Sequence, residues 1–217
     1  MTLGKVTAGK VRISPPGRPR DGAREEAILR ETLAILSEVG FSGLTVDAVV
    51  ARAKVSKATI YRRWATKEEL AIAAFDLLPP IQSPNTGSLE QDVQSYVEQY
   101  TRYLHTTPLR TVLPALISES MHNPALAQRL RSTVSRRRLS GVEIIERAIE
   151  RGELPVDTNA VLAQELIIGP MLHRSFFDPD NFAATDFQVF ARILIAGIRD
   201  YWGRGAHASK EKEKAKP

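Results

Sequence analysis

Residues 45–64 of this chain have the sequence TVDAVVARAKVSKATIYRRW. Thr45 can cap a first short helix. The apolar residues of that helix recur at the spacing of one buried face: Val46, Val49, Val50 and Ala53. A turn follows, and Ser56 can cap a second helix in which Ile60 and Trp64, four residues apart, face inward. The pattern predicts two short helices joined by a tight turn.

The second of these helices is expected to present an outward face suited to DNA. The side chains left on that face can donate to phosphates or reach base edges: Lys57, Thr59, Tyr61, Arg62 and Arg63. A helix that lies in a major groove requires such a set, so the stretch indicates a helix-turn-helix. The alternative is an ordinary helical hairpin with a solvated basic surface, because a run of charges often means no more than that.

A wider pattern surrounds this unit. Its segments are a first helix with Ile28, Leu29, Leu33, Ala34 and Leu36 that closes at Gly40 and Phe41, then Leu44-Thr45-Val46, Val55-Ser56-Lys57-Ala58-Thr59-Ile60-Tyr61, Trp64 and Lys67-Glu68-Glu69-Leu70. Together, residues 24–75 resemble the N-terminal DNA-binding domain of the TetR family of transcriptional regulators. Two positions depart from that family: Lys54 stands where Gly is usual, and Glu31-Thr32 replaces a common Ala pair. A positive φ at Lys54 would cost about 1 kcal/mol of strain.

The resemblance implies an all-α chain of about nine helices, with a helical ligand-binding and dimerisation domain after the helix-turn-helix. It also implies that DNA contacts come from the basic N-terminus and the helix-turn-helix. The residues that we expect to serve there are Arg18, Arg20, Arg24, Thr45, Ser56, Lys57, Ala58, Thr59, Tyr61, Arg62 and Lys67.

Composition agrees with a regulator of this kind. The 217 residues carry a net charge of +5, and residues 1–66 hold twelve basic against six acidic side chains, so the excess positive charge lies with the predicted DNA-binding part. The absence of cysteine excludes disulfides and thiolate metal ligands. No apolar run of about eighteen residues and no signal-peptide pattern occurs, so we expect a cytoplasmic protein without a membrane partner.

Breaks in the pattern divide the chain into four parts. We expect a flexible basic arm at 1–20, the helix-turn-helix domain at 21–78, a C-terminal regulatory domain at 79–203 and a disordered tail at 204–217. A Pro/Ser/Asn/Gly-rich linker at 79–88 marks the main boundary. Apolar periodicity and capping signals predict the remaining helices at 21–39, 66–78, 89–105, 109–121, 124–151, 158–173 and 186–202.

Enzyme motifs are missing from the sequence. The four histidines show no i, i+4 pairing, and neither a GxSxG elbow, a phosphate-binding loop nor a GxGxxG motif occurs. The adjacent acids at Glu25-Glu26 and Glu68-Glu69 begin helices, where the helix dipole accounts for them better than catalysis does. We therefore expect no catalytic residue, no cofactor and no metal site.

The C-terminal helices provide two further sets of candidates. By resemblance, the regulatory domain encloses a small-molecule cavity, and its candidate lining is Tyr96, Tyr100, Tyr103, Leu113, Ile117, Met121, Met171, His173 and Phe176. Core packing is the competing explanation for each of them. The last two helices are apolar on more than one face, and TetR-like proteins dimerise through theirs. The candidate interface is Leu166, Ile168, Phe190, Ile195 and Ile198, with the core of a monomer as the alternative.

The function expected from all of this is a ligand-responsive transcriptional regulator, and a repressor in particular. Its partners would be double-stranded DNA with a palindromic operator, a second copy of the chain and an unidentified small-molecule effector. The alternative is an architectural nucleic-acid binder without a ligand. The two differ in sequence preference, because an architectural binder discriminates little among DNA sequences at physiological salt.

Overall fold

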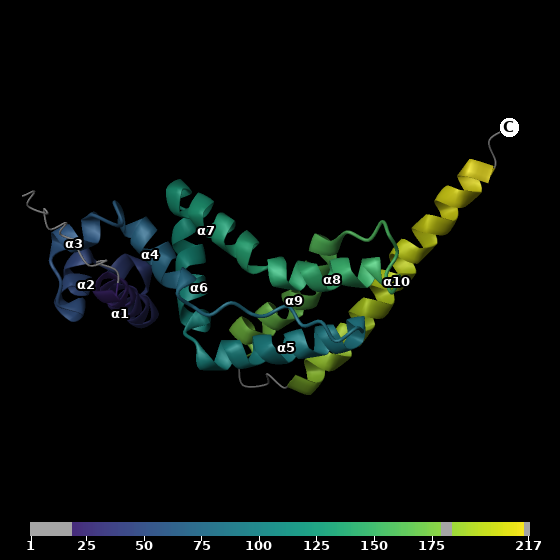
Figure 1. Cartoon of the computed structure of the whole chain (residues 1–217), viewed down its shortest axis with the longest axis horizontal. Helices are drawn as coiled ribbons and strands as arrows, with labels where there is room; N and C mark the ends of the chain where they lie inside the picture. Colours follow the sequence, from purple (N-terminus) through teal and green to yellow (C-terminus); the bar gives the residue numbers. More distant parts are fainter. Residues whose placement is uncertain (1–18, 179–183, 215–217) are drawn as a thin grey trace, which may run out of the picture.

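Helices make up the secondary structure of residues 19–178 and 184–214, the part of the chain that the computed structural model describes, and no strand occurs there. The all-α class is therefore confirmed. The helices are α1 (Pro19–Gly43), α2 (Val46–Ala53), α3 (Lys57–Tyr61), α4 (Lys67–Asp76), α5 (Leu89–Thr106), α6 (Leu109–Ser120), α7 (Pro124–Arg137), α8 (Leu139–Glu150), α9 (Ala160–Phe177) and α10 (Ala184–Lys214). Helices α1 to α4 form one end of the molecule, α5 and α8 to α10 form the other, and α6 and α7 lie between them (Figure 1).

The capping signals of the helix-turn-helix are confirmed. The Thr45 hydroxyl accepts a hydrogen bond from the Ala48 amide at 3.1 Å, and the Ser56 hydroxyl accepts one from the Thr59 amide at 3.2 Å. Lys54 ends α2 in the left-handed region, with φ 53° and ψ 47°. The turn therefore keeps the conformation for which glycine is best suited, although a lysine occupies it.

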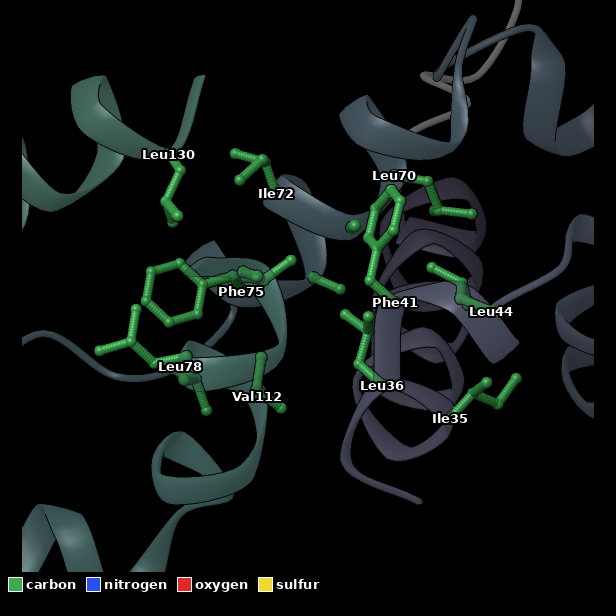
Figure 2. Close-up of a cluster of buried hydrophobic side chains, with 14 of the residues drawn as sticks. Ile35, Leu36, Phe41, Leu44, Leu70, Ile72, Phe75, Leu78, Val112 and Leu130 are labelled. Carbon is green, nitrogen blue, oxygen red and sulfur yellow. The ribbon is translucent and has the colours of Figure 1, made fainter. Parts of the chain in front are cut away.

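The first hydrophobic core joins the helix-turn-helix end to α6 and α7. Ile60 and Val49 from the predicted hairpin are fully buried in it. Figure 2 shows Leu36 and Phe41 facing the side chains of α4, with Val112 of α6 beyond them. Leu126 and Leu130 of α7 belong to the same cluster. The core therefore continues across residue 79, where the sequence suggested a domain boundary.

The second hydrophobic core is formed by α5, α8, α9 and α10. Its fully buried members include Leu89, Ile144, Ile145 and Ile198. The buried side of α8 faces this cluster through Ile144, Ile145 and Ala148. Helix α9 is apolar around most of its circumference, and such a helix must be buried on several sides. The second core of the chain buries one of these sides.

Three expected helix limits need correction. The helix expected at 124–151 is two helices, with a break at Arg138, because the apolar side of α7 belongs to the first core and that of α8 to the second. This split raises the number of helices in the described residues from nine to ten. Helix α1 begins at Pro19 and not at residue 21, since proline is tolerated in a first helical turn.

The other limits follow from backbone geometry. Gly40 has φ 70° and interrupts the helical path of α1, which matches the predicted close at Gly40 and Phe41. Gly152 has φ 75° directly after α8, as expected for a glycine stop. Helix α10 continues to Lys214 and does not end near residue 202 as expected. Residues 1–18, which contain most of the predicted arm, lie outside the described part of the chain.

Candidate nucleic-acid interface and cavity

One side of helix α3 is buried in the domain, and the other side is exposed to solvent. Ile60 is 1% exposed and Trp64 is 8% exposed, whereas Tyr61 is 51% exposed. Lys57, Ala58 and Arg62 are exposed as well, and Thr59 is half-buried. An aromatic side chain that remains so exposed beside basic residues is available to a partner, and a helix of this kind can enter a major groove.

Lys57 pairs with Asp47 of α2 across the turn, with 2.7 Å between the ammonium nitrogen and the carboxylate oxygen. Both side chains are exposed, so the pair adds little to stability. The hydrogen bond to Asp47, followed by its charge, raises the pKa of Lys57. Lys57 therefore stays protonated at neutral pH, and its ammonium can exchange Asp47 for a phosphate oxygen.

Thr45 and Ser56 serve as helix caps, which uses one lone pair of each hydroxyl. The Ser56 and Thr59 hydroxyls also form a hydrogen bond of 2.9 Å. Arg24 is exposed on α1. Arg18 lies outside the described residues, and so does the side chain of Arg20, whose backbone begins α1.

Two basic side chains attach the helix-turn-helix to α1: Arg63, which was expected to face outward, and Lys67, which was expected among the DNA contacts. Arg63 forms an ion pair with Glu25, and its side chain is 21% exposed. The Lys67 ammonium donates to the Phe41 carbonyl at 3.0 Å and lies 4.2 Å from the centre of the Phe41 ring. Carbonyls at a helix end need partners, so Lys67 caps α1. Lys67, which was expected among the DNA contacts, is thus half-buried against α1.

A cavity of about 230 Å³ lies where the two cores meet. Three tyrosines of α5 and Leu113 of α6 line it, and these four were among the expected residues. The remaining lining residues are Phe75, Ile81, Leu109, Val134, Arg137, Arg138, Gln164, Glu165, Ile168, Gly169 and Leu172. The walls are thus mostly apolar, with a polar group of side chains contributed by α7 and α9.

Five expected lining residues lie elsewhere. Ile117 and Met121 are 45% and 78% exposed, because the apolar stripe of α6 continues past the cavity to the surface. Met171 is buried in the second core, and Phe176 packs against the first. His173 is exposed, with its ring 5.0 Å from that of Phe177.

The sequence analysis missed the polar lining of the cavity. Arg137 and Arg138 belong to a run of three arginines, which resembles a solvated surface, and Gln164 and Glu165 lie on a helix chosen for its apolar residues. The sequence around Gly141 did not indicate either that this glycine lies at the wall of the cavity. A Cβ atom there would lie 2.8 Å from Gln164 Cγ and 2.9 Å from the Tyr96 hydroxyl oxygen. Only glycine lets α8 approach this wall of the cavity.

The cavity tyrosines are neutral hydrogen-bonding groups. Burial raises the pKa of Tyr96, Tyr100 and Tyr103. Gln164 acts in the opposite direction on the pKa of Tyr96, and Arg137 does so on that of Tyr103. All three phenols therefore keep their protons at neutral pH and supply no negative charge to the cavity.

Polar contacts connect α4 to α7 alongside the cavity. Asn123 donates to Glu68 at 2.9 Å, Arg129 pairs with Glu69 at 2.7 Å, and Arg136 pairs with Asp76 at 2.6 Å. The acids that the sequence attributed to the first turn of α4 are thus partners for a second helix. These contacts run from the start of α4 to its end, so a displacement of α7 reaches the helix that follows the helix-turn-helix.

The proposed dimer residues separate into two groups. Ile168, Ile195 and Ile198 are between 3% and 6% exposed and pack in the chain's own second core, which leaves little of their surface for a second copy. Leu166 and Phe190 are 40% and 37% exposed. They belong to a set of large apolar residues at helical spacing, which we call the outer face: Val161, Leu162, Leu166, Val189, Phe190, Ile193 and Tyr201.

Within the described residues, no helix is long and apolar enough to cross a membrane, and no group of three His, Cys, Asp or Glu side chains is placed to hold a metal ion.

Two protein families match the chain. The family described as "Bacterial regulatory proteins, tetR family" matches residues 28–74, and "Tetracyclin repressor-like, C-terminal domain" matches residues 83–193. The uncharacterized HTH-type transcriptional regulator YdeS of Bacillus subtilis is 36% identical over 77% of this chain and 86% of its own length. The DNA-binding transcriptional repressor TetR of Mycobacteroides abscessus is 31% identical over 71% of this chain and 83% of its own.

Solved structures share the fold at low identity. A putative transcriptional regulator from Pseudomonas aeruginosa PAO1 has a TM-score of 0.67 at 19% identity, covering 87% of this chain and 93% of its own. The regulator FadR of Bacillus subtilis, solved in complex with stearoyl-CoA, has a TM-score of 0.63 at 16% identity, covering 79% and 98%.

Proposed function

Because the chain belongs to the TetR family of transcriptional regulators, we propose that it is a repressor that binds a palindromic operator as a homodimer and releases it when a small molecule enters the cavity. The observation that carries the DNA-binding part is α3, whose buried Ile60 fixes the orientation of an exposed Tyr61. The DNA contacts come from Lys57, Tyr61 and their exposed neighbours on α3, with the basic arm adding phosphate contacts.

The outer face of α9 and α10 supports the homodimer. Val189 and Ile193 are 57% and 62% exposed, and Leu162 is 43% exposed. Monomeric proteins seldom leave so many large apolar residues together in water. A two-fold dimer buries the same face on both copies and places two α3 helices against one side of DNA, where they meet half-sites in successive major grooves.

The cavity supports a small-molecule effector. It lies between α4, which follows the helix-turn-helix, and the helices of the second core. A ligand that binds one conformation more tightly than another shifts the protein toward that conformation. The cavity is smaller than the typical pocket range of about 300–1,000 Å³, which suits a compact ligand. The FadR structure, solved in complex with stearoyl-CoA, is a precedent for ligand binding on this fold.

Selection from a pool of random duplex DNA tests the proposal. Full-length protein should enrich one imperfect palindrome whose half-sites lie about one helical turn or more apart. Binding to it should exceed binding to a scrambled duplex by about 1,000-fold or more at physiological salt. Retention of all sequences with similar affinity would favour the architectural alternative, since charge alone gives binding without sequence preference.

A further inference from the structure

Arg137 is the arginine of α7 that faces the cavity, and its contacts differ from those of its neighbours. Arg136 pairs with Asp76 and Arg138 pairs with Glu165. Arg137 donates instead to the carbonyls of Leu78 at 3.0 Å and Pro79 at 2.9 Å, and to the Tyr103 hydroxyl at 2.5 Å. Among the described residues, no carboxylate pairs with Arg137. Its charge therefore meets only neutral acceptors.

The surroundings of Arg137 leave that charge uncompensated. The guanidinium carbon lies 5.3 Å from the ring centre of Phe75 and 5.8 Å from that of Tyr103, and both rings line the cavity. Aromatic faces attract a cation, but more weakly than an anion does at low dielectric. Tyr103 remains a neutral phenol because burial raises its pKa. The charged residues of the lining are Arg137, Arg138 and Glu165, so the cavity carries an excess of one positive charge.

Tyr100 supplies a second polar group that lacks a partner. It lies on α5 between Tyr96 and Tyr103 and lines the cavity, and no hydrogen bond to its hydroxyl occurs within the described part of the chain. Tyr103, by contrast, has a partner, because its hydroxyl accepts a hydrogen bond from Arg137. Tyr100 is half-buried at the cavity wall, so its hydroxyl can donate a hydrogen bond to a ligand bound there.

We propose that the cavity binds a compact aromatic weak acid as its anion, with the anionic group held by Arg137 and hydrogen-bonded by Tyr100. This inference rests on the proposed function, because it names the chemical class of the effector for that cavity. Leu113, Ile168 and Leu172 provide apolar contacts for the aromatic body. A planar guanidinium offers two parallel donors to a carboxylate, which makes the pairing both strong and directional.

The same arginine connects the ligand to the helix-turn-helix. Leu78 and Pro79 directly follow α4, and their carbonyls are held by the two terminal nitrogens of Arg137. A carboxylate in the cavity draws these donors away from the carbonyls. Phe75, on the last turn of α4, lines the cavity as well. Binding of the anion thus loosens the end of α4, and operator affinity falls as the ligand binds.

Matched pairs of probes test the proposal on the full-length protein. Benzoate, 2-naphthoate and 4-phenylbenzoate cover a range of sizes, and each is compared with its neutral amide by isothermal titration calorimetry. The carboxylate of the best-fitting pair should bind roughly tenfold to a hundredfold more tightly than its amide, as expected for a hydrogen bond to a charged group. The same carboxylate should weaken operator binding at concentrations where the amide does not.

Variants assign the preference to Arg137. Arg137→Gln should remove the carboxylate preference, and Tyr100→Phe should weaken both members of each pair. Arg137→Lys should keep part of the preference, because lysine retains the charge but not the two parallel donors. Arg131→Gln is the matched control, because it removes the same charge from an exposed position of α7. If circular dichroism shows that Arg137→Gln does not fold, the test uses the ratio of carboxylate affinity to amide affinity. This ratio is then compared between the wild type and Arg137→Lys.

Two results would overturn the proposal. One is a panel in which no carboxylate binds more tightly than its amide, and the other is a preference that survives intact in a folded Arg137→Gln protein. Neither result affects operator selection in the absence of ligand, which tests the proposed function separately.

Discussion

The helix-turn-helix and the cavity differ in how far apart in the chain their residues lie. Residues 45–64 contain both helices, the caps and the turn of the first region. The cavity draws on α4, α5, α6, α7 and α9, with lining residues from Phe75 to Leu172. The first is therefore a product of local sequence, and the second exists only when five helices meet. Substitutions should show this difference, from the largest effect to the smallest.

The largest effects on folding and assembly should come from substitutions of Ile195 and Ile193, which lie two residues apart on α10. Ile195 is 3% exposed in the second core, so Ile195→Asp buries an unpaired carboxylate, which costs several kcal/mol and removes much of the stability of a domain. Ile193 is 62% exposed on the outer face, so Ile193→Asp should leave the chain folded but separate the dimer. Circular dichroism melts and sedimentation velocity measure the two outcomes. An Ile193→Asp protein that sediments like a wild-type dimer contradicts the proposed interface.

Substitution of Gly141, at the wall of the cavity, should lower the stability of the protein. Gly141→Ala places a Cβ against Gln164 and Tyr96, and overpacking of this kind costs about 1–3 kcal/mol of unfolding free energy. Gly22→Ala is the control, since nothing lies within 4 Å of its added Cβ, and it should stabilise α1 by up to about 1 kcal/mol. Urea denaturation measures both. The close approach of α8 would be refuted by a Gly141→Ala protein as stable as the wild type.

The surface of α3 should affect DNA binding without affecting the fold. Lys57→Ala and Tyr61→Ala should each weaken operator binding roughly tenfold, because each removes one contact to phosphate or base. The melting temperature should not change, since both side chains are exposed. Fluorescence anisotropy with labelled operator measures the affinity, and Arg131→Ala serves as a control on another helix. Wild-type affinity in either α3 variant would mean that a different face of the domain meets DNA.

The smallest effect should come from the turn itself. Lys54 has φ 53°, and Lys54→Gly should stabilise the protein by at most about 1 kcal/mol, because relief of strain is partly offset by the greater freedom of glycine in the unfolded chain. Lys54→Ala keeps the Cβ atom and should bring no gain. Chemical denaturation of both variants provides the comparison. A stabilising effect of alanine equal to that of glycine would show that the backbone at this turn is unstrained.

The sequence predicted the first region well because its signals act over a few residues. A cap bonds an amide three positions away, and Thr45, Ser56 and Thr66 all do so in the structure. The sequence left the sign of φ at Lys54 open, although the resemblance places a usual glycine there, and the structure has it positive. Residues that act over longer distances were harder to place. Arg63 was expected to face outward and Lys67 to contact DNA, yet both contact residues of the first helix.

The sequence by itself thus determined the all-α class, the helix-turn-helix and the side of α3 that faces outward, because helical periodicity and capping are local properties. Tertiary structure alone decided which apolar side of α9 and α10 is internal: Ile168 and Leu166 lie two residues apart, but only Ile168 is covered by the chain's own core. It also decided that Arg137 and Arg138 line the cavity whereas Arg136, next to them in the sequence, pairs with Asp76. Both outcomes depend on which helix packs against which side, and this is set by contacts between segments far apart in the chain.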